Sequence, residues 1–191
     1  MTILDARESA PSEGGPSFSL ANRLTRVAWT LVWGIGASWT PRQLAPWRRF
    51  LLRCFGARME PGSDVRASAR VWLPANLHLG PRAVIGPQVN VYSMGPIEVG
   101  ADVLVSQGAH LCAGTHDSDS PEFQLVARPI RIGARAWIAA EAFVGPGAQI
   151  GEGVVLGARA VAFGELAPWT VYSGNPARPI RPRRRTPRTD R

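Results

Sequence analysis

A six-residue period runs through the middle and C-terminal parts of this chain and sharply restricts the folds open to it. In the C-terminal half an aliphatic residue recurs every six positions, and a small or aliphatic residue follows four positions after each. The aliphatic series is Ile132, Ile138, Val144, Ile150 and Leu156, with partners beginning at Ala136, Ala142 and Ala148. The same phase covers shorter blocks between Val65 and Leu111, with two-residue slips near Leu77 and Ile97.

This period fits neither an α-helix of 3.6 residues per turn nor a strand of ordinary length. It fits a triangular coil, in which each hexad supplies one short strand and one corner. The aliphatic residue points inward, and the small residue lets the corner close. Three hexads complete a turn, so residues eighteen apart stack at the strand spacing of about 4.8 Å. We predict an all-β fold, a left-handed parallel β-helix, over residues 61–172, one of the rare exceptions to right-handed crossover.

One segment interrupts the repeat. Residues 117–131 lack the period for fifteen positions, after which it resumes in phase. We predict a loop extruded from a corner of the coil, and long loops on rigid scaffolds commonly carry function. His116 directly precedes this loop, and a histidine imidazole can accept a proton from a hydroxyl group. We therefore take His116 as a candidate general base, with a loop-anchoring role as the alternative.

The segments that flank the repeat differ from it in composition. Residues 1–16 are polar and rich in Gly, Pro and Ser, and we predict that they are disordered. Residues 17–60 form a predicted helical region, and residues 173–191 a C-terminal extension with a basic tail. The first helix carries an apolar row that Trp29 and Trp33 widen, and its members are Leu20, Leu24, Val27 and Leu31.

A second apolar stripe runs from Trp47 to Phe55, and Arg48, Arg49 and Arg53 lie largely off it. Apolar stripes of this kind usually pack on the rest of the protein, and here they would cap the open end of the β-helix. The alternative is that this Trp-rich, Arg-flanked pair of helices lies at a membrane interface.

The net charge of +8 is unevenly distributed, and all 22 basic residues are Arg. Residues 64–165 hold seven Arg and nine acidic residues, whereas the excess lies in residues 23–58 and 178–191. Basic flanks favour contact with phosphate groups or an anionic membrane, and a solvated tail that maintains solubility is the alternative. Nucleic acid is not an expected partner, because the tail has no interleaved aromatic residues and no recognisable binding fold accompanies it.

The sequence also bears on location. The longest uncharged stretch, Val27–Pro41, is shorter than the ~20 residues that a spanning helix needs. Cys54 and Cys112 are too few for a disulfide framework, and no signal peptide precedes the folded region. We expect a cytoplasmic protein, with peripheral contact at the inner face of the cytoplasmic membrane as a further expectation.

Several segments together resemble the hexapeptide-repeat acetyltransferases: LCAGTHD, RPIRIGARAWIAAEAFVGPGAQIG and VYSGNPARPIR. The resemblance runs from about Phe18 to Arg181 and is greatest to the branch for colanic acid and other exopolysaccharides. Maltose and galactoside acetyltransferases are more distant relatives. The resemblance implies a homotrimer that binds acetyl-CoA between neighbouring subunits and acetylates a hydroxyl of a free or lipid-linked saccharide.

The resemblance also implies a donor side of the site. Trp137 matches a residue that lines the acetyl-CoA cleft, and Ala158 matches a position beside the pantetheine arm. Ala140 occupies a position where relatives often have Ser, so only its backbone N–H is left to bind the thioester carbonyl. Arg178 and Arg181 match residues near the CoA phosphates, a role that suits guanidinium groups.

On the acceptor side, His116 matches the catalytic histidine of the family. Asn90 and Tyr92 lie upstream of it, where relatives contact the acceptor. Asp117 and Asp119 are candidates to orient His116 or bind the acceptor, and ordinary surface acids are the alternative. The acceptor itself is not encoded in any motif that we recognise.

Three other functions are consistent with parts of the sequence. N-acetylation of an amino-sugar would use the same base and cleft. A γ-class carbonic anhydrase shares the fold and binds zinc through three histidines, which here would be His78, His110 and His116. Trp137 and the CoA-type ending argue against this function, and we expect no metal. An acyl-cysteine at Cys112 lacks an evident triad, so a packed thiol is the better interpretation.

Overall fold

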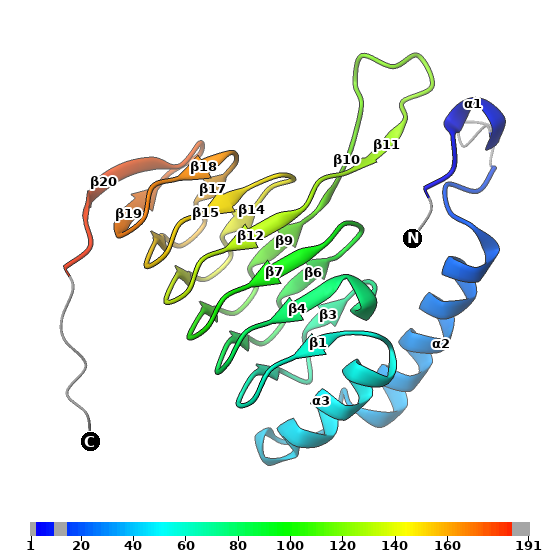
Figure 1. The fold of residues 1–191 in the computed structure, drawn as a ribbon, viewed down its shortest axis with the longest axis horizontal. Helices are drawn as coiled ribbons and strands as arrows, with labels where there is room; N and C mark the ends of the chain where they lie inside the picture. The colour runs from blue at the N-terminus through cyan, green and yellow to red at the C-terminus, as the bar shows by residue number, and fades with distance from the viewer. Residues whose placement is uncertain (1–2, 10–14, 185–191) are drawn as a thin grey trace.

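The computed structural model describes residues 3–9 and 15–184, and the predicted parallel β-helix is confirmed (Figure 1). Short strands stack into three sheets around a triangular coil, with helices at its N-terminal end. The first sheet contains β1 (Arg58–Met59), β4 (Leu77–Leu79), β7 (Ile97–Val99), β12 (Ile130–Ile132), β15 (Gln149–Ile150) and β18 (Glu165–Leu166). The third sheet contains β3 (Arg70–Val71), β6 (Asn90–Tyr92), β9 (His110–Cys112), β14 (Phe143–Val144) and β17 (Val161–Ala162).

The second sheet lies between these two in chain order. It contains β2 (Asp64–Val65), β5 (Val84–Ile85), β8 (Leu104–Val105), β13 (Trp137–Ile138), β16 (Val155–Leu156), β19 (Thr170–Ser173) and β20 (Arg178–Pro182). All its neighbours are parallel except β20, which turns back antiparallel to β19 and closes the C-terminal end. The sheet therefore carries the C-terminal extension.

The spacing of stacked residues shows where the coils differ in length. After the hairpin the partners are eighteen residues apart, as in Trp137 and Val155, except in the last turn, where Gln149 and Glu165 are sixteen apart. In the N-terminal half they are twenty apart, as in Val84 and Leu104. The two extra residues lie where the chain passes from the third sheet back to the first, which we call the return corner. They correspond to the short helix η3 (Pro74–Asn76) and to residues 93–96, so the slips expected near Leu77 and Ile97 are confirmed.

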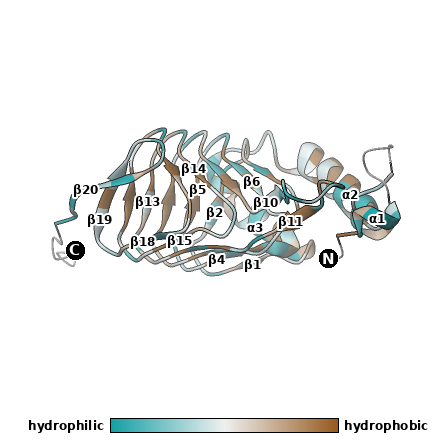
Figure 2. Ribbon diagram, turned by 90° about the horizontal axis from the view of Figure 1, so that it is seen from above, coloured by the Kyte–Doolittle hydropathy of each residue, from teal (hydrophilic) through white to brown (hydrophobic). Residues whose placement is uncertain are grey.

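The core is the column of side chains inside the coil. The inward aliphatic residues are fully buried, among them Val65, Ile85, Val105, Ile138 and Leu156. Figure 2 shows the hydrophobic residues that run along the stacked strands. Corners are equally tight, since a Cβ at Gly100 would lie 2.6 Å from the backbone nitrogen of Ala134. The repeat therefore encodes both the filling of the coil and the closeness of its turns.

Two helices cover the first coil at the N-terminal end, α2 (Leu20–Gly36) and α3 (Ala45–Cys54), joined through η2 (Arg42–Leu44) (Figure 1). Their side chains donate to carbonyls along its open edge. The indole N–H groups of Trp29 and Trp33 bond Val71 O at 2.7 Å and Ala67 O at 3.2 Å. These bonds satisfy acceptors that an exposed edge would otherwise leave unpaired.

A buried charge also belongs to this cap. Arg48 is 1% exposed, and its Nε donates to Val65 O at 2.8 Å. Its Nη2 lies 3.0 Å from Asp64 Oδ1, and Asp64 also pairs with Arg66 at 2.9 Å. Arg48 is thus buried although it lies off the apolar stripe, because its guanidinium is the donor that the edge carbonyls and the Asp64 carboxylate require.

The favoured packing of the leucine row is wrong. Trp29 and Trp33 face the coil and are buried, whereas the row itself is solvent-exposed along its whole length: Leu20, Leu24, Val27 and Leu31. The reason is that each Trp contributes both a large apolar surface and an N–H donor to the first coil, and a leucine has no donor. In α3, Leu51 and Leu52 are buried while Trp47 and Phe50 are exposed.

Some sequence predictions fall on residues outside the described part. Residues 1–2 and 10–14 of the segment predicted to be disordered lie there, as do residues 185–191 of the basic tail. Within the described residues, a short helix α1 (Ala6–Ser9) precedes α2. No helix in residues 3–9 and 15–184 is long and apolar enough to cross a membrane.

Candidate functional site

A β-hairpin interrupts the coil at the return corner and projects away from it (Figure 1). Its strands are β10 (Gly114–His116) and β11 (Leu125–Ala127), paired antiparallel with His116 opposite Leu125. The Arg128 N–H donates to Ala113 O at 2.9 Å and closes the base of the hairpin. The extruded segment thus begins at Gly114, before the predicted start at residue 117, and the coil resumes at Ile130, so His116 lies on the hairpin and not on the coil.

His116 is exposed on this hairpin with its ring held in one orientation. Nδ1 lies 2.7 Å from Phe123 O, and the ring stacks on the Phe123 ring at a centroid distance of 5.0 Å. Because a carbonyl oxygen only accepts hydrogen bonds, Nδ1 must carry the proton. In neutral His116 the lone pair is then on Nε2, the nitrogen that a general base would use.

The loop builds this arrangement from its own backbone. Phe123 has a φ of 53°, in the left-handed region, and its N–H donates to Ser120 O at 2.9 Å. The Asp117 carboxylate accepts the Asp119 N–H at 3.1 Å, so it is engaged within the loop. The group that orients His116 is thus the Phe123 carbonyl. Sequence reasoning missed it, because a backbone carbonyl leaves no signal in residue type.

The N-terminal segment also contacts this loop. Gln124 Oε1 accepts the Ala6 N–H at 2.7 Å, and Gln124 Nε2 donates to Leu4 O at 3.3 Å. Gln124 directly follows Phe123, so residues 4–6 hold the part of the loop that orients His116. Nothing in the sequence indicated this contact, which joins residues about 120 positions apart.

Asn90 lies on β6 and faces outward from the third sheet. Its Nδ2 is 3.1 Å from Nε2 of His110, one coil further on. Burial lowers the pKa of His110, which favours its neutral form, and its Nε2 then accepts the amide N–H of Asn90. Asn90 is therefore held by His110, whose role the sequence did not suggest.

Tyr92 lies on the same strand, nearer to the hairpin. Its ring packs edge-on against Trp72 at 5.7 Å, and a Cβ added at Gly114 would approach it to 2.9 Å. Burial raises the pKa of Tyr92, with a smaller contribution from Cys112. Because Gly114 begins β10, Tyr92 lies against the base of the hairpin that carries His116.

Trp137 belongs to a different face. It lies on β13 in the second sheet with its side chain partly exposed, and its indole N–H donates to Ser106 Oγ at 2.9 Å. That bond fixes the orientation of the ring. Trp137 is therefore an aromatic side chain of fixed orientation beside the corner that leads from the second sheet to the third.

Ala140 and Ala158 occupy that second-to-third corner in successive coils. The Arg159 N–H donates to Ala140 O at 2.9 Å, so the two corners stack. Among the described residues neither alanine N–H has a hydrogen-bond partner, a feature shared by the equivalent N–H of Gln107. What distinguishes the two alanines is their small side chains; Ala158 is exposed and Ala140 is half-buried.

Arg178 and Arg181 lie on β20, and both are exposed. Arg181 lines a hollow of about 440 Å³ with Arg183 and Arg184. Arg183 is committed to the fold, because its Nη1 donates to Arg135 O at 2.8 Å and to Gly153 O at 3.0 Å. Arg181 donates only to the adjacent Pro182 O, at 3.0 Å, so its guanidinium, like that of Arg178, is not tied to the coil.

A single chain does not bring all the predicted residues together. Tyr92, His116 and Asp117 lie at or near the return corner, Ala140 and Ala158 lie at the second-to-third corner, and Asn90 begins a strand of the third sheet that runs between them. The third sheet separates the two corners. The acceptor-side and donor-side candidates are therefore on opposite edges of one face.

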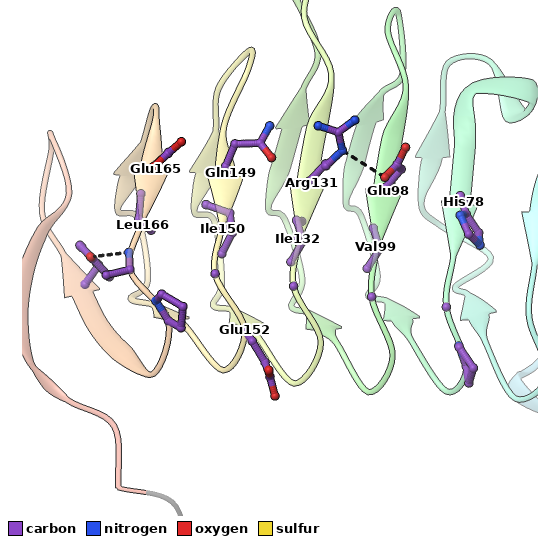
Figure 3. A pocket seen from close by; sticks show the side chains of 18 of the residues that line it. His78, Glu98, Val99, Arg131, Ile132, Gln149, Ile150, Glu152, Glu165 and Leu166 are labelled. Carbon is purple, nitrogen blue, oxygen red and sulfur yellow. Dashed lines mark hydrogen bonds and ion pairs between the residues drawn. The ribbon is translucent and has the colours of Figure 1, made fainter.

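A hollow of about 960 Å³ lies over the first sheet and contains none of the predicted site residues (Figure 3). Its outward row includes Glu98 and Arg131, which pair at 3.2 Å, and then Gln149 and Glu165. It extends toward the first-to-second corner, away from the hairpin. We place the candidate site at His116, because there the Phe123 carbonyl orients an exposed imidazole on a hairpin that projects from the coil.

The histidines of the carbonic anhydrase alternative are dispersed within one chain. His78 is on β4, His110 on β9 and His116 on β10. Over residues 3–9 and 15–184, no group of three or more His, Cys, Asp or Glu side chains is placed to hold a metal ion.

Comparison with known proteins identifies the family. The chain is 41% identical over 166 residues to the putative colanic acid biosynthesis acetyltransferase WcaF of Escherichia coli, covering 87% of this chain and 91% of that protein. The chain belongs to the hexapeptide-repeat acetyltransferases. Within this family the match to WcaF spans the cap, the coil and the hairpin together, and no protein-family model matches the chain.

Solved structures of hexapeptide-repeat acetyltransferases share the fold. A maltose O-acetyltransferase from Clostridium difficile has a TM-score of 0.78 at 22% identity, covering 87% of this chain and 90% of that one. A Vibrio cholerae hexapeptide-repeat acetyltransferase in complex with acetyl coenzyme A has a TM-score of 0.75 at 21% identity, covering 86% and 88%. The coil and its N-terminal helices are therefore a shared framework.

Proposed function

We propose that this acetyltransferase moves the acetyl group of acetyl-CoA onto a hydroxyl of a saccharide used in exopolysaccharide synthesis, with His116 as general base. The observation that carries the proposal is the bond between His116 Nδ1 and Phe123 O, which leaves Nε2 as the basic nitrogen. The colanic acid assignment of the 41% identical relative supports the acceptor class, and the acetyl coenzyme A in the Vibrio cholerae structure supports the donor.

The reaction is a direct transfer. Nε2 of His116 takes the proton of the acceptor hydroxyl as that oxygen attacks the thioester carbonyl carbon. The tetrahedral intermediate then collapses, the C–S bond breaks, and the CoA thiolate takes the proton from the imidazolium. The products are an acetyl ester and CoA with a free thiol, and His116 returns to its neutral form.

The donor-side residues fit acetyl-CoA in distinct ways. Trp137 supplies an aromatic wall whose orientation is fixed by Ser106. The free N–H groups of Ala140 and Ala158 suit the carbonyl oxygens of the thioester and the pantetheine arm. Arg178 and Arg181 offer guanidinium groups to the phosphates.

We further propose a homotrimer, because the two sets of residues lie on opposite edges of one face and a neighbouring subunit would bring them together. Coexpression of His116→Ala with Ala158→Trp tests this, since the larger side chain blocks the donor corner and leaves His116 intact. With random assembly about a quarter of the interfaces combine two intact halves, so about a quarter of wild-type activity should return. A site within one chain predicts no recovery.

The primary test is His116→Ala, which should lower turnover by ~10² or more with the fold intact. Thiol release from acetyl-CoA is followed with a panel of free and lipid-linked saccharides as acceptors. A well-folded variant with unchanged turnover would remove His116 from the mechanism. If an amino-sugar is acetylated on nitrogen in preference to any hydroxyl, the reaction is N-acetylation. We also propose that the enzyme acts in the cytoplasm, where acetyl-CoA is the expected donor.

A further inference from the structure

The outer face of α2 is an uncovered apolar ridge. Of the fourteen large hydrophobic side chains exposed in the described residues, nine lie in residues 20–50. Five of them form one row along α2 and are between 57% and 76% exposed: Leu20, Leu24, Val27, Leu31 and Ile35. A contiguous apolar row of this length on a helix normally has a partner.

The rotation of α2 is fixed, so the ridge does not turn inward. At about 100° per residue, Trp29 and Trp33 lie about 180° from the centre of the row. Both indole N–H groups bond carbonyls of the first coil, and both rings are buried. Gly34, on the ridge side, has open space where a Cβ would be. The cap therefore points the ridge away from the protein.

A cluster of aromatic side chains continues the ridge beyond the end of α2. Trp39 is 70% exposed, and Trp47 stacks on Phe50 at a centroid distance of 5.6 Å. The indole N–H groups of Trp39 and Trp47 donate to Ile35 O and Gly36 O at 2.6 and 2.8 Å. Because these donors are already satisfied, the rings can enter an apolar medium without leaving a polar group unpaired.

The charge around this surface has one sign. Residues 17–59 contain seven Arg and no Asp or Glu, and all of these Arg except Arg48, which is buried in the cap, are at least partly exposed. Arg23 and Arg26 line, with Val27, Thr30 and Leu31, a hollow of about 350 Å³ beside the ridge. Two guanidinium groups above apolar walls match a phosphate group that is attached to hydrocarbon.

We propose that this surface, formed by the α2 ridge and the aromatic cluster, docks onto an anionic phospholipid bilayer. The ridge and the aromatic rings enter the headgroup and upper acyl region, and the surrounding Arg side chains meet lipid phosphates. A second copy that presented the same surface would set Arg against Arg with no acid to compensate. A free phosphate would leave the apolar row exposed to water. The docking is independent of the proposed reaction.

Vesicle cosedimentation of the full chain tests the proposal. Phosphatidylcholine vesicles with and without phosphatidylglycerol are compared at low and high salt. We expect binding to the anionic vesicles that salt weakens. Leu24→Ser with Leu31→Ser should lower partitioning roughly 100-fold, because each leucine loses its burial in the bilayer. Arg23→Gln with Arg42→Gln should lower it roughly 10- to 30-fold on anionic vesicles only.

Matched variants separate docking from fold and net charge. Ala21→Ser with Ala28→Ser imposes a similar helix-propensity cost on exposed positions of α2 without removing large apolar groups, and should bind as wild type. Arg82→Gln with Arg131→Gln removes the same charge from the β-helix, and should also bind as wild type. Inorganic phosphate should not displace the protein. Failure of the wild type to bind anionic vesicles would overturn the proposal. A leucine variant that changes the mass of the assembly and leaves vesicle binding unchanged would also overturn it, and would assign the ridge to a subunit contact.

Discussion

Replacing Arg48 with methionine should destabilise the protein far more than replacing its neighbour Arg49. Arg48 is buried between α3 and the first coil, whereas Arg49 is partly exposed and makes one bond, to Ser63 O at 2.9 Å. Methionine retains much of the apolar volume and removes the guanidinium. The comparison therefore isolates the buried charge and its hydrogen bonds.

The magnitude follows from the partners that Arg48 would abandon. Its guanidinium lies within 3.0 Å of Val65 O, Pro41 O, Thr40 Oγ1 and Asp64 Oδ1. Three of these acceptors are neutral and cost about 1 kcal/mol each when left unpaired, and the carboxylate costs more. Arg66 still pairs with Asp64, which limits the loss, so we expect a decrease of about 3–4 kcal/mol in the free energy of unfolding.

Thermal unfolding followed by circular dichroism, at one protein concentration for all variants, measures this loss. The expected decrease in Tm is roughly 6–16 °C for Arg48→Met. Arg49→Met should cost below about 1 kcal/mol. Asp64→Asn in the Arg48→Met background should recover part of the loss, because it removes the stranded carboxylate. Equal shifts for Arg48→Met and Arg49→Met would refute the reasoning.

Two further predictions concern the site. Arg178→Ala with Arg181→Ala should raise the Kd for CoA, measured by calorimetry, about tenfold with little effect on kcat. Moderate salt should likewise weaken CoA binding to the wild type. An unchanged Kd in the double variant would leave both residues as surface charges. Gln124→Ala should release the loop from residues 4–6. We therefore expect kcat to fall several-fold at unchanged CoA affinity, and amide hydrogen exchange in residues 117–124 to become faster. Unchanged exchange would show that the loop keeps its conformation without residues 4–6.

The coil was predictable because its signal is repeated. Each hexad repeats the same burial pattern, so the interior column and the slips near Leu77 and Ile97 follow from periodicity alone. The cap was predicted less well, since the first apolar row read from α2 is the exposed one. A helical period shows that a face is apolar but not which of two apolar faces packs. Here the indole donors of Trp29 and Trp33 decided it, by meeting carbonyls whose positions exist only after the coil has formed.

The site divides in the same manner. His116 could be singled out because it stands where the repeat breaks. Its orienting partner could not, because the Phe123 carbonyl is backbone and its direction depends on a left-handed residue within the loop. The contact of Gln124 with residues 4–6 depends on where the chain path brings the N-terminus. Main-chain donors and acceptors are thus the part of a site that residue types do not predict.

The return corner has a bearing on how acceptor specificity can change. The coils differ in length there, through η3, residues 93–96, the hairpin and the shortened last turn at Phe163–Gly164. Strands on both sides of the hairpin nevertheless pair in register, with Ile130 opposite Ile97. The hairpin is therefore an insertion between Ala113 and Ile130, and it can be exchanged without changing the pairing of the coil strands. On the proposed function, the donor-side residues would stay with the coil, while His116 and its orienting carbonyl would move with the hairpin.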